Sequence, residues 1–323
     1  MTQTRDHGGD LSAAIARFGG RPEGWIDLST GINRVPYPLP RLGAADWRDL
    51  PGGAAQAGLI AAARGAYGTG WPVLPLAGAQ AAIQLLPGLA APGRARIVAP
   101  TYNEYAAALT GAGWQVAQVA DPAALAGADL GVVVNPNNPD GRRTPPEALR
   151  ALAGDVGLLV VDESFADADP GVSLLPGDCP GNVIVLRSFG KFYGLAGLRL
   201  GFALGARAHL DRMARQAGPW AVSGPALAVG AVALADTEWR AASVARLMID
   251  GARIDALAAG AGWQAVGGCA LFRLYDTPGA TAARDRLARA HIWSRLFPYS
   301  DRWLRLGLPG TPDEWARLAA ALG

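Results

Sequence analysis

The sequence has little cysteine, little charge and almost no lysine. Its two cysteines, Cys179 and Cys269, are too few for a disulfide framework, and neither has metal-ligand neighbours at a useful spacing. Charged residues make up only 17% of the 323 residues, and the formal net charge is +2. This balance gives no reason to expect nucleic acid or a membrane surface as a partner. We therefore expect a reduced, cytoplasmic globular protein without a bound metal.

Long hydrophobic runs are also scarce. The segment 1–10 is polar and lacks the apolar stretch of a signal peptide. The segment 217–235 carries no charge and has about the length of a membrane span, but it contains two prolines and many small residues. We interpret it as a loop that leads into a buried, alanine-rich helix. Half of the chain is hydrophobic, which excludes intrinsic disorder.

The scarcity of lysine is the most informative feature of the composition. The 29 basic residues comprise 28 arginines and a single lysine, Lys191. A coding bias toward arginine explains the loss of lysine wherever only a positive charge is needed. It does not replace a primary amine, because arginine stays protonated and cannot condense with an aldehyde. Lys191 has either survived by chance or serves as a reactive amine.

Short apolar runs alternate with helical patterns from Val73 onward. The expected strands are 73–76, 96–99, 115–119, 131–134, 157–161, 183–186 and 200–204, and helices are expected at 80–86 and 104–112. Strands without polar alternation are buried on both faces, so the sequence predicts an α/β fold with a mostly parallel seven-stranded sheet. Ligands bind at the carboxyl ends of such strands, where the polar residues of this sequence gather.

The pattern changes in the last third of the chain. Helices are expected at 238–259 and 278–290, and strands at 269–274 and 303–306. The first forty residues contain paired glycines and three closely spaced prolines, which favour an extended arm. We therefore expect an N-terminal arm (1–40) that joins the small domain, a large domain (41–215) and a small α+β domain (216–323).

Four polar motifs follow the expected strands. Gly78-Ala79-Gln80 opens a helix, where backbone N–H groups can bind an anion. Asn138-Pro139-Asp140-Gly141 and Asp162-Glu163 each follow a buried run, although an ordinary turn and a helix cap would explain them as well. In the segment 188–199, Ser188 and Arg199 flank Lys191 and are suited to hold a phosphate dianion.

Together these residues resemble the fold-type I pyridoxal-5′-phosphate enzymes, the aspartate aminotransferase superfamily, over nearly the whole chain. The resemblance implies a cofactor site in which Lys191 is the catalytic lysine that binds the cofactor covalently. Asp162 would pair with the pyridine nitrogen, Asn138 would bond the phenolic oxygen, and Tyr102 would stack on the ring. The phosphate would be held by Ser188, Arg199 and the backbone at Ala79 and Gln80. Arg305 would bind the substrate carboxylate.

Two features favour a decarboxylase within this superfamily. Phe165 stands where the aminotransferases usually carry a tyrosine that donates to the phenolic oxygen. The segments 7–10, 29–33, 162–165 and 302–305 resemble the L-threonine O-3-phosphate decarboxylases of cobalamin biosynthesis more closely than the histidinol-phosphate aminotransferases. This resemblance implies a phosphorylated amino acid as substrate and (R)-1-amino-2-propanol O-2-phosphate as product.

The substrate would be surrounded by His7, Asn33, Arg295 and Arg305. His7 could instead belong to a frayed terminus, and Arg295 could pair with Asp301 at the surface. The resemblance also implies a homodimer, although Leu50-Pro51-Gly52 stands where relatives often carry a tyrosine that reaches the neighbouring subunit's cofactor.

Two other functions remain open from the sequence. One is an aminotransferase that acts on histidinol phosphate or an aromatic amino acid. The other is a non-catalytic cofactor sensor, which would require a helix-turn-helix domain before Thr30, where the chain has only 29 residues and no such pattern.

Overall fold

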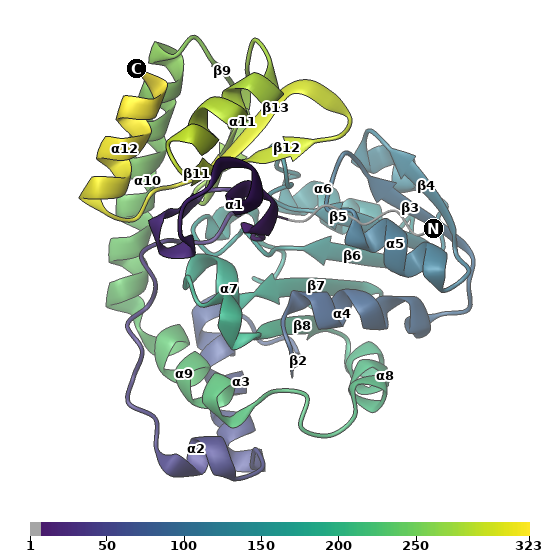
Figure 1. The fold of residues 1–323 in the computed structure, drawn as a ribbon. Helices are drawn as coiled ribbons and strands as arrows, with labels where there is room; N and C mark the ends of the chain where they lie inside the picture. Colours follow the sequence, from purple (N-terminus) through teal and green to yellow (C-terminus); the bar gives the residue numbers. More distant parts are fainter. Residues whose placement is uncertain (1–7) are drawn as a thin grey trace. The chain divides into compact units, whose positions relative to one another are not determined.

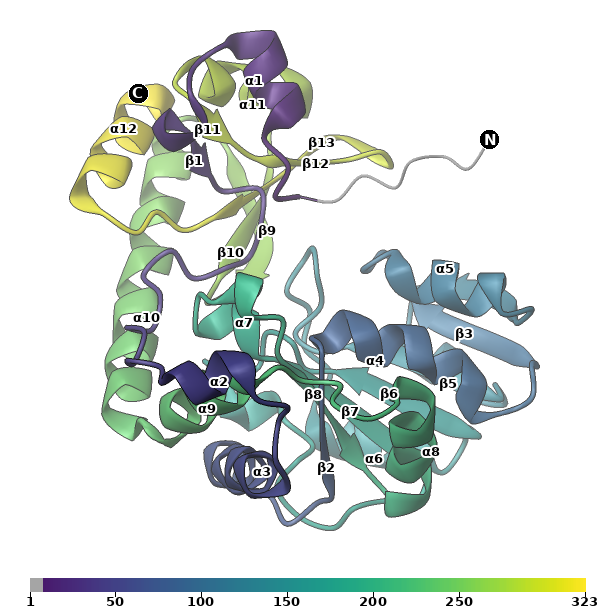
Figure 2. The same ribbon diagram turned by 60° about the horizontal axis from the view of Figure 1, so that its bottom comes forward.

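The computed structural model describes residues 8–323, which form two compact units (Figures 1 and 2). The large unit is Pro36–Ala242, and the small unit combines the chain up to Val35 with Ser243–Gly323. These limits differ from the expected ones at residues 36–40 and 216–242. The helix α9 (Gly224–Ala235) belongs to the large unit because it packs on α3 (Gly53–Tyr67), where a Cβ added at Gly230 would come within 2.9 Å of Leu59.

The large unit contains a seven-stranded sheet with the strand order β2-β8-β7-β6-β5-β3-β4. Its strands are β2 (Val73–Leu76), β3 (Arg94–Val98), β4 (Gln115–Val119), β5 (Leu130–Val134), β6 (Leu158–Asp162), β7 (Val183–Ser188) and β8 (Gly201–Gly205). Only β8 runs antiparallel to its neighbours, so the expected mostly parallel sheet is confirmed.

Helices cover both faces of this sheet. The core on one face joins β5, β6 and β7 to α4 (Ala79–Leu85), α5 (Glu104–Gly111) and α8 (Arg207–Ala217). The helix α6 (Pro146–Ala153) packs on β6 from the other side, with Leu149 and Leu152 buried. The remaining helices are α2 (Ala44–Arg48) and α7 (Phe189–Phe192), with short 3-10 turns at Leu86–Leu89, Pro122–Leu125, Pro170–Val172 and Ala196–Leu198. Every residue of β5 and β6 is buried, as their unbroken apolar sequences predict.

The small unit contains an antiparallel sheet with the order β12-β13-β10-β9 and a two-stranded parallel pair, β1-β11. The strands are β1 (Ile26–Asp27), β9 (Gln264–Cys269), β10 (Phe272–Asp276), β11 (Ile292–Trp293), β12 (Arg295–Phe297) and β13 (Ser300–Gly307). The helices are α1 (Ser12–Phe18), α11 (Ala280–Arg289), α12 (Pro312–Leu322) and most of α10 (Thr237–Gly260), with a 3-10 turn at Pro22–Gly24.

Two local expectations differ from the structure, and a third is confirmed. The expected strand at 269–274 is wrong, because β9 ends at Cys269 and a turn at Ala270 and Leu271 leads into β10. This turn carries none of the residues that usually mark a hairpin. The expected arm contains a helix, α1. The alanine-rich helix is confirmed as α9, which Ser223 caps through its hydroxyl, and no helix within 8–323 is long and apolar enough to cross a bilayer.

Candidate active site

The carboxyl ends of β5, β6 and β7 lie side by side. Val134 pairs with Asp162, and Asp162 pairs with Leu186, so the three parallel strands end at the same edge of the sheet. The polar residues predicted from the sequence follow directly: Asn138 lies in the loop after β5, Asp162 ends β6 and Ser188 ends β7. The fold therefore gathers three motifs that are up to 50 residues apart in the chain.

Asp162 is a buried carboxylate with both oxygens in use. Its Oδ2 accepts a hydrogen bond of 2.7 Å from the Tyr105 hydroxyl, and its Oδ1 accepts one of 2.8 Å from the Ser164 N–H. Burial, together with the nearby Asp162, raises the pKa of Tyr105 well above its usual value, so the hydroxyl stays a donor. Sequence reasoning missed Tyr105, which sits in α5 without any motif around it.

Tyr102 is oriented by the first turn of α4. Its hydroxyl donates to Gln80 Oε1 over 3.1 Å, and Gln80 Nε2 donates to Glu104 over 2.9 Å. The structure thus joins Gln80 and Tyr102, which were predicted separately, and adds Glu104, which the sequence did not suggest. The Tyr102 ring lies edge-on to Tyr105, with the centroids 6.5 Å apart.

Lys191 lies in the short helix α7, and its Nζ is 5.7 Å from the centre of the Phe165 ring. Aromatic side chains pack against this helix and hold it in place. Tyr193 is stacked between Phe189 and Trp239, at centroid distances of 4.4 and 5.4 Å. The backbone that carries the lysine is therefore held rigidly, while the lysine itself is only half-buried.

Arg199 and the β2–α4 turn lie against one another. A Cβ added at Gly78 would lie 2.8 Å from Arg199 Nη2, and the φ of +82° at this position is one that residues other than glycine rarely adopt. A Cβ at Gly201 would lie 2.4 Å from the backbone nitrogen of Ala79, which places β8 directly beside the start of α4. The turn that precedes Gln80 is thus packed against Arg199 with no space for a further side chain.

The loop after β5 is fixed by Asn137, the neighbour of Asn138. Its Oδ1 accepts a 2.7 Å hydrogen bond from the Thr101 hydroxyl, and its Nδ2 donates to the carbonyl of Pro100 over 2.9 Å. These bonds join the loop that carries Asn138 to the segment before Tyr102.

Two arginines of the small unit stand opposite each other. Arg295 of β12 pairs with Arg305 of β13, and Arg305 is only 6% exposed. Like charges placed directly across a strand pair repel. Burial and, next, Arg295 lower the pKa of Arg305 to about 10. Such a pair is suited to hold an anion.

Asn33 is buried in the same unit. Its Oδ1 accepts hydrogen bonds from Arg246 Nη2 at 2.8 Å and from the Val35 N–H at 3.1 Å. Arg246 is a further residue that the sequence did not suggest. His7, the remaining expected substrate residue, lies outside the described residues.

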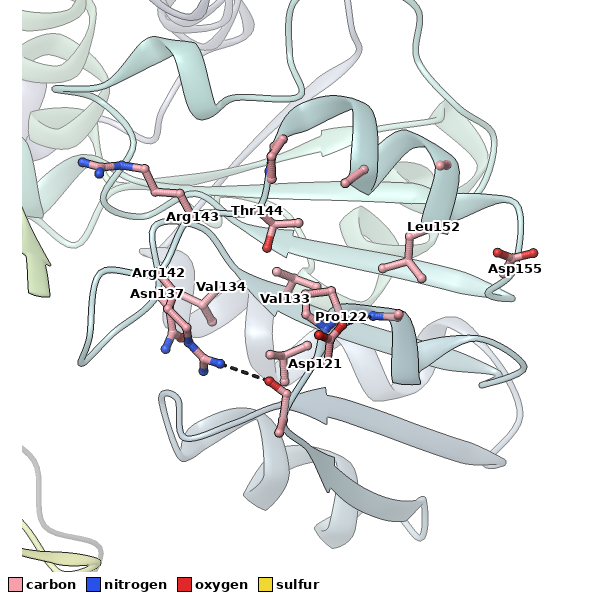
Figure 3. A pocket seen from close by; sticks show the side chains of 16 residues that line it. Asp121, Pro122, Val133, Val134, Asn137, Arg142, Arg143, Thr144, Leu152 and Asp155 are labelled. Carbon is pink, nitrogen blue, oxygen red and sulfur yellow. Dashed lines mark hydrogen bonds between the residues drawn. The ribbon is translucent and has the colours of Figure 1, made fainter. Parts of the chain in front are cut away.

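A cavity of about 640 Å³ lies against α6 on the large unit, and Asn137, the neighbour of Asn138, is among its lining residues (Figure 3). Val133 and Leu152 form part of its apolar wall, and Arg142 reaches across it to the carbonyl of Ala120 over 3.0 Å. Among the described residues that line it, none is a predicted site residue. The chemistry therefore points to the strand ends rather than to this cavity. Residues 8–323 contain no cluster of side chains that could hold a metal ion.

Comparison with known proteins gives matches over nearly the full chain. The family described as "Aminotransferase class I and II" matches residues 71–322. A threonine-phosphate decarboxylase from Sinorhizobium is 46% identical over 98% of this chain and 97% of its own, and one from Pseudomonas aeruginosa is 44% identical over the same shares. A solved structure, histidinol-phosphate aminotransferase from Sinorhizobium meliloti in complex with pyridoxal-5′-phosphate, has a TM-score of 0.83. It is 24% identical and covers 97% of this chain and 93% of that one.

Proposed function

This chain belongs to the class I and II aminotransferase family, and we propose that within the family it is a pyridoxal-phosphate-dependent decarboxylase of L-threonine O-3-phosphate. One observation carries the proposal: the two threonine-phosphate decarboxylases are 46% and 44% identical over 98% of the chain. The product would be (R)-1-amino-2-propanol O-2-phosphate, an intermediate of cobalamin biosynthesis. The aminotransferase similar in structure is only 24% identical and supports the fold alone.

The residues at the strand ends fit pyridoxal phosphate. The site offers an amine at Lys191, a guanidinium at Arg199 beside a turn with no room for a side chain, and a buried carboxylate at Asp162. A planar ring that carries an aldehyde, a phosphate and a basic nitrogen requires these three kinds of group. Because Tyr105 and Ser164 fix both oxygens of Asp162, the carboxylate is preorganised to keep the ring nitrogen protonated.

We assign the remaining roles on the cofactor as follows. Lys191 would hold the aldehyde carbon covalently, Tyr102 would stack on the ring, and Asn138 would bond its phenolic oxygen. Ser188, Arg199 and the backbone at Ala79 and Gln80 would hold the phosphate. The hydrogen bond from Tyr102 to Gln80 supports these assignments because it fixes the orientation of a side chain that would otherwise rotate.

We assign Arg295, Arg305 and Asn33 to the substrate, together with His7. The opposed arginines support this role, because a bound phosphate or carboxylate would relieve their repulsion. Arg246 would orient the Asn33 amide, so that its Nδ2 points away from the guanidinium and remains a donor.

Where the protein holds the charged groups of the substrate decides which bond of the α-carbon breaks. When bound, pyridoxal phosphate supplies an electron sink that takes up the electron pair of whichever α-carbon bond stands perpendicular to its ring. Arginines that fix both the phosphate and the carboxylate of the substrate would turn the carboxylate into that position. Lys191 Nζ would then deliver the proton that the α-carbon receives in place of CO₂. Phe165, which has no hydroxyl, would leave Asn138 as the main donor to the phenolic oxygen.

We further propose that the enzyme acts in the cytoplasm as a homodimer. Several large apolar side chains near the start of the large unit support an interface there, since Leu39, Trp47 and Leu50 are each about 70% exposed. The partner's contribution cannot be the tyrosine common in relatives, because Leu50-Pro51-Gly52 occupies that stretch.

An activity assay tests the proposed function. The cofactor-loaded enzyme is mixed with L-threonine O-3-phosphate in the absence of a keto acid, and CO₂ and the amine product are measured. We expect stoichiometric CO₂ and 1-amino-2-propanol phosphate, with no glutamate when 2-oxoglutarate is added. Formation of glutamate without CO₂ would show that the chain is an aminotransferase.

A further inference from the structure

Five buried polar side chains form a cluster inside the large unit: Tyr67, Glu163, Asp167, Arg187 and Tyr193. Arg187 lies at the centre, with its Nη2 3.0 Å from Glu163, its Nη1 3.7 Å from Asp167 and its guanidinium carbon 4.6 Å from the centre of the Tyr67 ring. None of the five is more than 5% exposed. We call them the buried polar cluster.

The two carboxylates of the cluster, Glu163 and Asp167, differ in the hydrogen bonds that they accept. Glu163 accepts hydrogen bonds from the Ser173 hydroxyl at 2.6 Å and from the Leu174 N–H at 2.7 Å, in addition to its ion pair. Neither oxygen of Asp167 has a hydrogen-bond partner in the part of the chain that the structure describes. Burial raises the pKa of Asp167, and the nearby Arg187 offsets this only in part.

Four side chains of the cluster carry unsatisfied polar atoms. Besides the two oxygens of Asp167, Nε and Nη1 of Arg187 and the hydroxyls of Tyr67 and Tyr193 are buried without a hydrogen-bond partner among the described residues. Arg187 lies 3.7 Å from Asp167 and over the Tyr67 ring, and Asp167, Arg187 and Tyr193 each shift the pKa of Tyr67. Buried polar groups in native proteins are rarely left unbonded, and a buried water typically makes about three hydrogen bonds to such groups.

The cluster is connected covalently to the cofactor residues. Glu163 follows Asp162, Arg187 precedes Ser188, and the backbone N–H of Glu163 donates to Leu186 over 2.9 Å. Successive side chains of a strand point to opposite faces. The Glu163–Arg187 ion pair therefore joins the ends of β6 and β7 on the face opposite to Asp162 and Ser188.

Asp167 and Tyr193 are also close in the sequence to residues of the proposed active site. Asp167 comes two residues after Phe165, and Tyr193 comes two residues after Lys191, whose Nζ lies over the Phe165 ring. A link between Asp167 and Tyr193 would join the segment after β6 to the helix that carries the lysine. Within residues 8–323 the two side chains make no direct hydrogen bond, but one water bonded to both would supply the link.

We propose that Asp167, Arg187, Tyr67 and Tyr193 bind one or two internal water molecules, and that the hydrated cluster positions Asp162 and Lys191 for the reaction. These are positioning residues, because none of them touches the reacting atoms. The water site stands by itself, whereas the positioning role rests on the proposed function. A purely stabilising role is the weaker explanation, because a buried ion pair often contributes little to stability compared with apolar residues of the same volume.

The water site is tested by a crystal structure of the unmodified protein at about 1.5 Å resolution. We expect density for water within hydrogen-bond distance of Asp167 and of at least two other members. Direct contact among the side chains, with no water between them, would refute it. The same experiment on Tyr67→Phe is expected to show the water displaced or lost.

The positioning role is tested with Asp167→Asn and Tyr67→Phe, which keep the volume of each side chain. For both we expect a changed absorption maximum of the bound cofactor and a fall in kcat of about 10- to 100-fold, with KM within about 2-fold of the unmodified enzyme. The matched control is Tyr275→Phe, which removes a buried hydroxyl bonded to Asp255 in the small unit. It should leave kcat and the cofactor spectrum unchanged.

The outcomes separate the two proposals. An unchanged spectrum and kcat in both cluster variants would overturn the positioning role, and so would an equal fall in kcat for the control at an equal loss of melting temperature. An unmodified protein that binds no cofactor would overturn the proposed function and the positioning role with it, while the water site would still be decided by diffraction.

Discussion

At the scale of the residue, Arg295 and Arg305 of the small unit lie directly opposite each other across β12 and β13. Arg305 is buried, and burial together with the charge of Arg295 lowers its pKa. Like charges placed directly across a strand pair repel, and a bound anion would relieve that repulsion. The pair therefore argues for a dianion or a carboxylate at this position.

Replacement of Arg295 tests this argument. Without an added anion, we expect Arg295→Gln to raise the melting temperature of the cofactor-loaded protein by a few degrees, because a repulsion of about 1 kcal/mol is removed. In inorganic phosphate the unmodified protein should gain stability, and the variant should gain clearly less. Differential scanning fluorimetry over a phosphate series measures both effects.

The control for this experiment is Arg302→Gln, which removes the same charge from the neighbouring strand β13. Arg302 is exposed and pairs with Asp276. We expect it to keep the full response to phosphate. An identical phosphate response in Arg295→Gln would show that this arginine binds no anion.

The sequence predicted the residues that carry motifs but not the side chains that orient them. Asp162 and Lys191 stand out because an acid after a buried strand and a single lysine are rare. Tyr105 and Arg246 do not, since each lies within a helix of ordinary composition. Their partners are 57 and 213 residues away, and only the fold brings them together.

At the scale of the element, the seven strands of the large sheet were predicted because short, mainly apolar runs alternate with helical patterns along the chain. The hairpin β9–β10 was not, because its turn contains alanine and leucine rather than glycine, proline or asparagine. The helix α1 was missed for a similar reason, since paired glycines on either side of it suggested an extended arm.

The contact between β8 and the start of α4 makes a prediction at this scale. We expect Gly201→Ala to weaken cofactor binding at least 10-fold and to destabilise the protein by about 1–3 kcal/mol, because its Cβ would lie 2.4 Å from the nitrogen of Ala79. Equilibrium dialysis of the cofactor and thermal unfolding measure the two effects. Gly197→Ala is the control, since its Cβ would have nothing within 4 Å. Equal cofactor affinity in both variants would show that this turn does not hold the phosphate.

The start of α12 makes a prediction about acid stability. Burial alone would raise the pKa of Glu314, but hydrogen bonds from Arg34 and the Gly310 N–H outweigh it and hold the pKa below its usual value. A lowered carboxylate pKa gives stability that is present above the unfolded-state pKa and is lost as the pH falls through the folded-state pKa. We expect Glu314→Gln to lower the free energy of unfolding by about 1–2 kcal/mol at pH 7, and the difference to vanish as the pH falls through the lowered pKa of Glu314.

Urea unfolding between pH 3 and pH 7 measures this dependence. The control is Asp313→Asn, which removes the same charge from the neighbouring acid in the first turn of α12. A pH-independent difference between Glu314→Gln and the unmodified protein would contradict the assigned ion pair.

At the scale of the whole molecule, the chain folds as two units, each with its own sheet. The sequence revealed both, because the helical and strand patterns change along the chain. It could not place the limit at α9, since an alanine-rich helix has no polar face to show which core it joins. That choice is made by packing on α3.

The proposed homodimer is tested at this scale by sedimentation equilibrium. We expect a species of twice the 33.3 kDa chain mass. Trp47→Asp, which places a charge on an exposed apolar side chain of α2, should shift the equilibrium toward the monomer. Val266→Asp, at an exposed apolar position of β9, serves as the control. A fully active species of 33.3 kDa would contradict the dimer.

The central claim is that the amine of Lys191 holds the cofactor, and one measurement tests it most directly. The cofactor-loaded protein is reduced with borohydride, digested and analysed by mass spectrometry, alongside Lys191→Arg, which keeps the charge but cannot condense with an aldehyde. We predict a cofactor adduct on the peptide that contains Lys191 and no adduct in the variant, which should also lose its visible absorption. A colourless unmodified protein without an adduct on Lys191 would contradict the account.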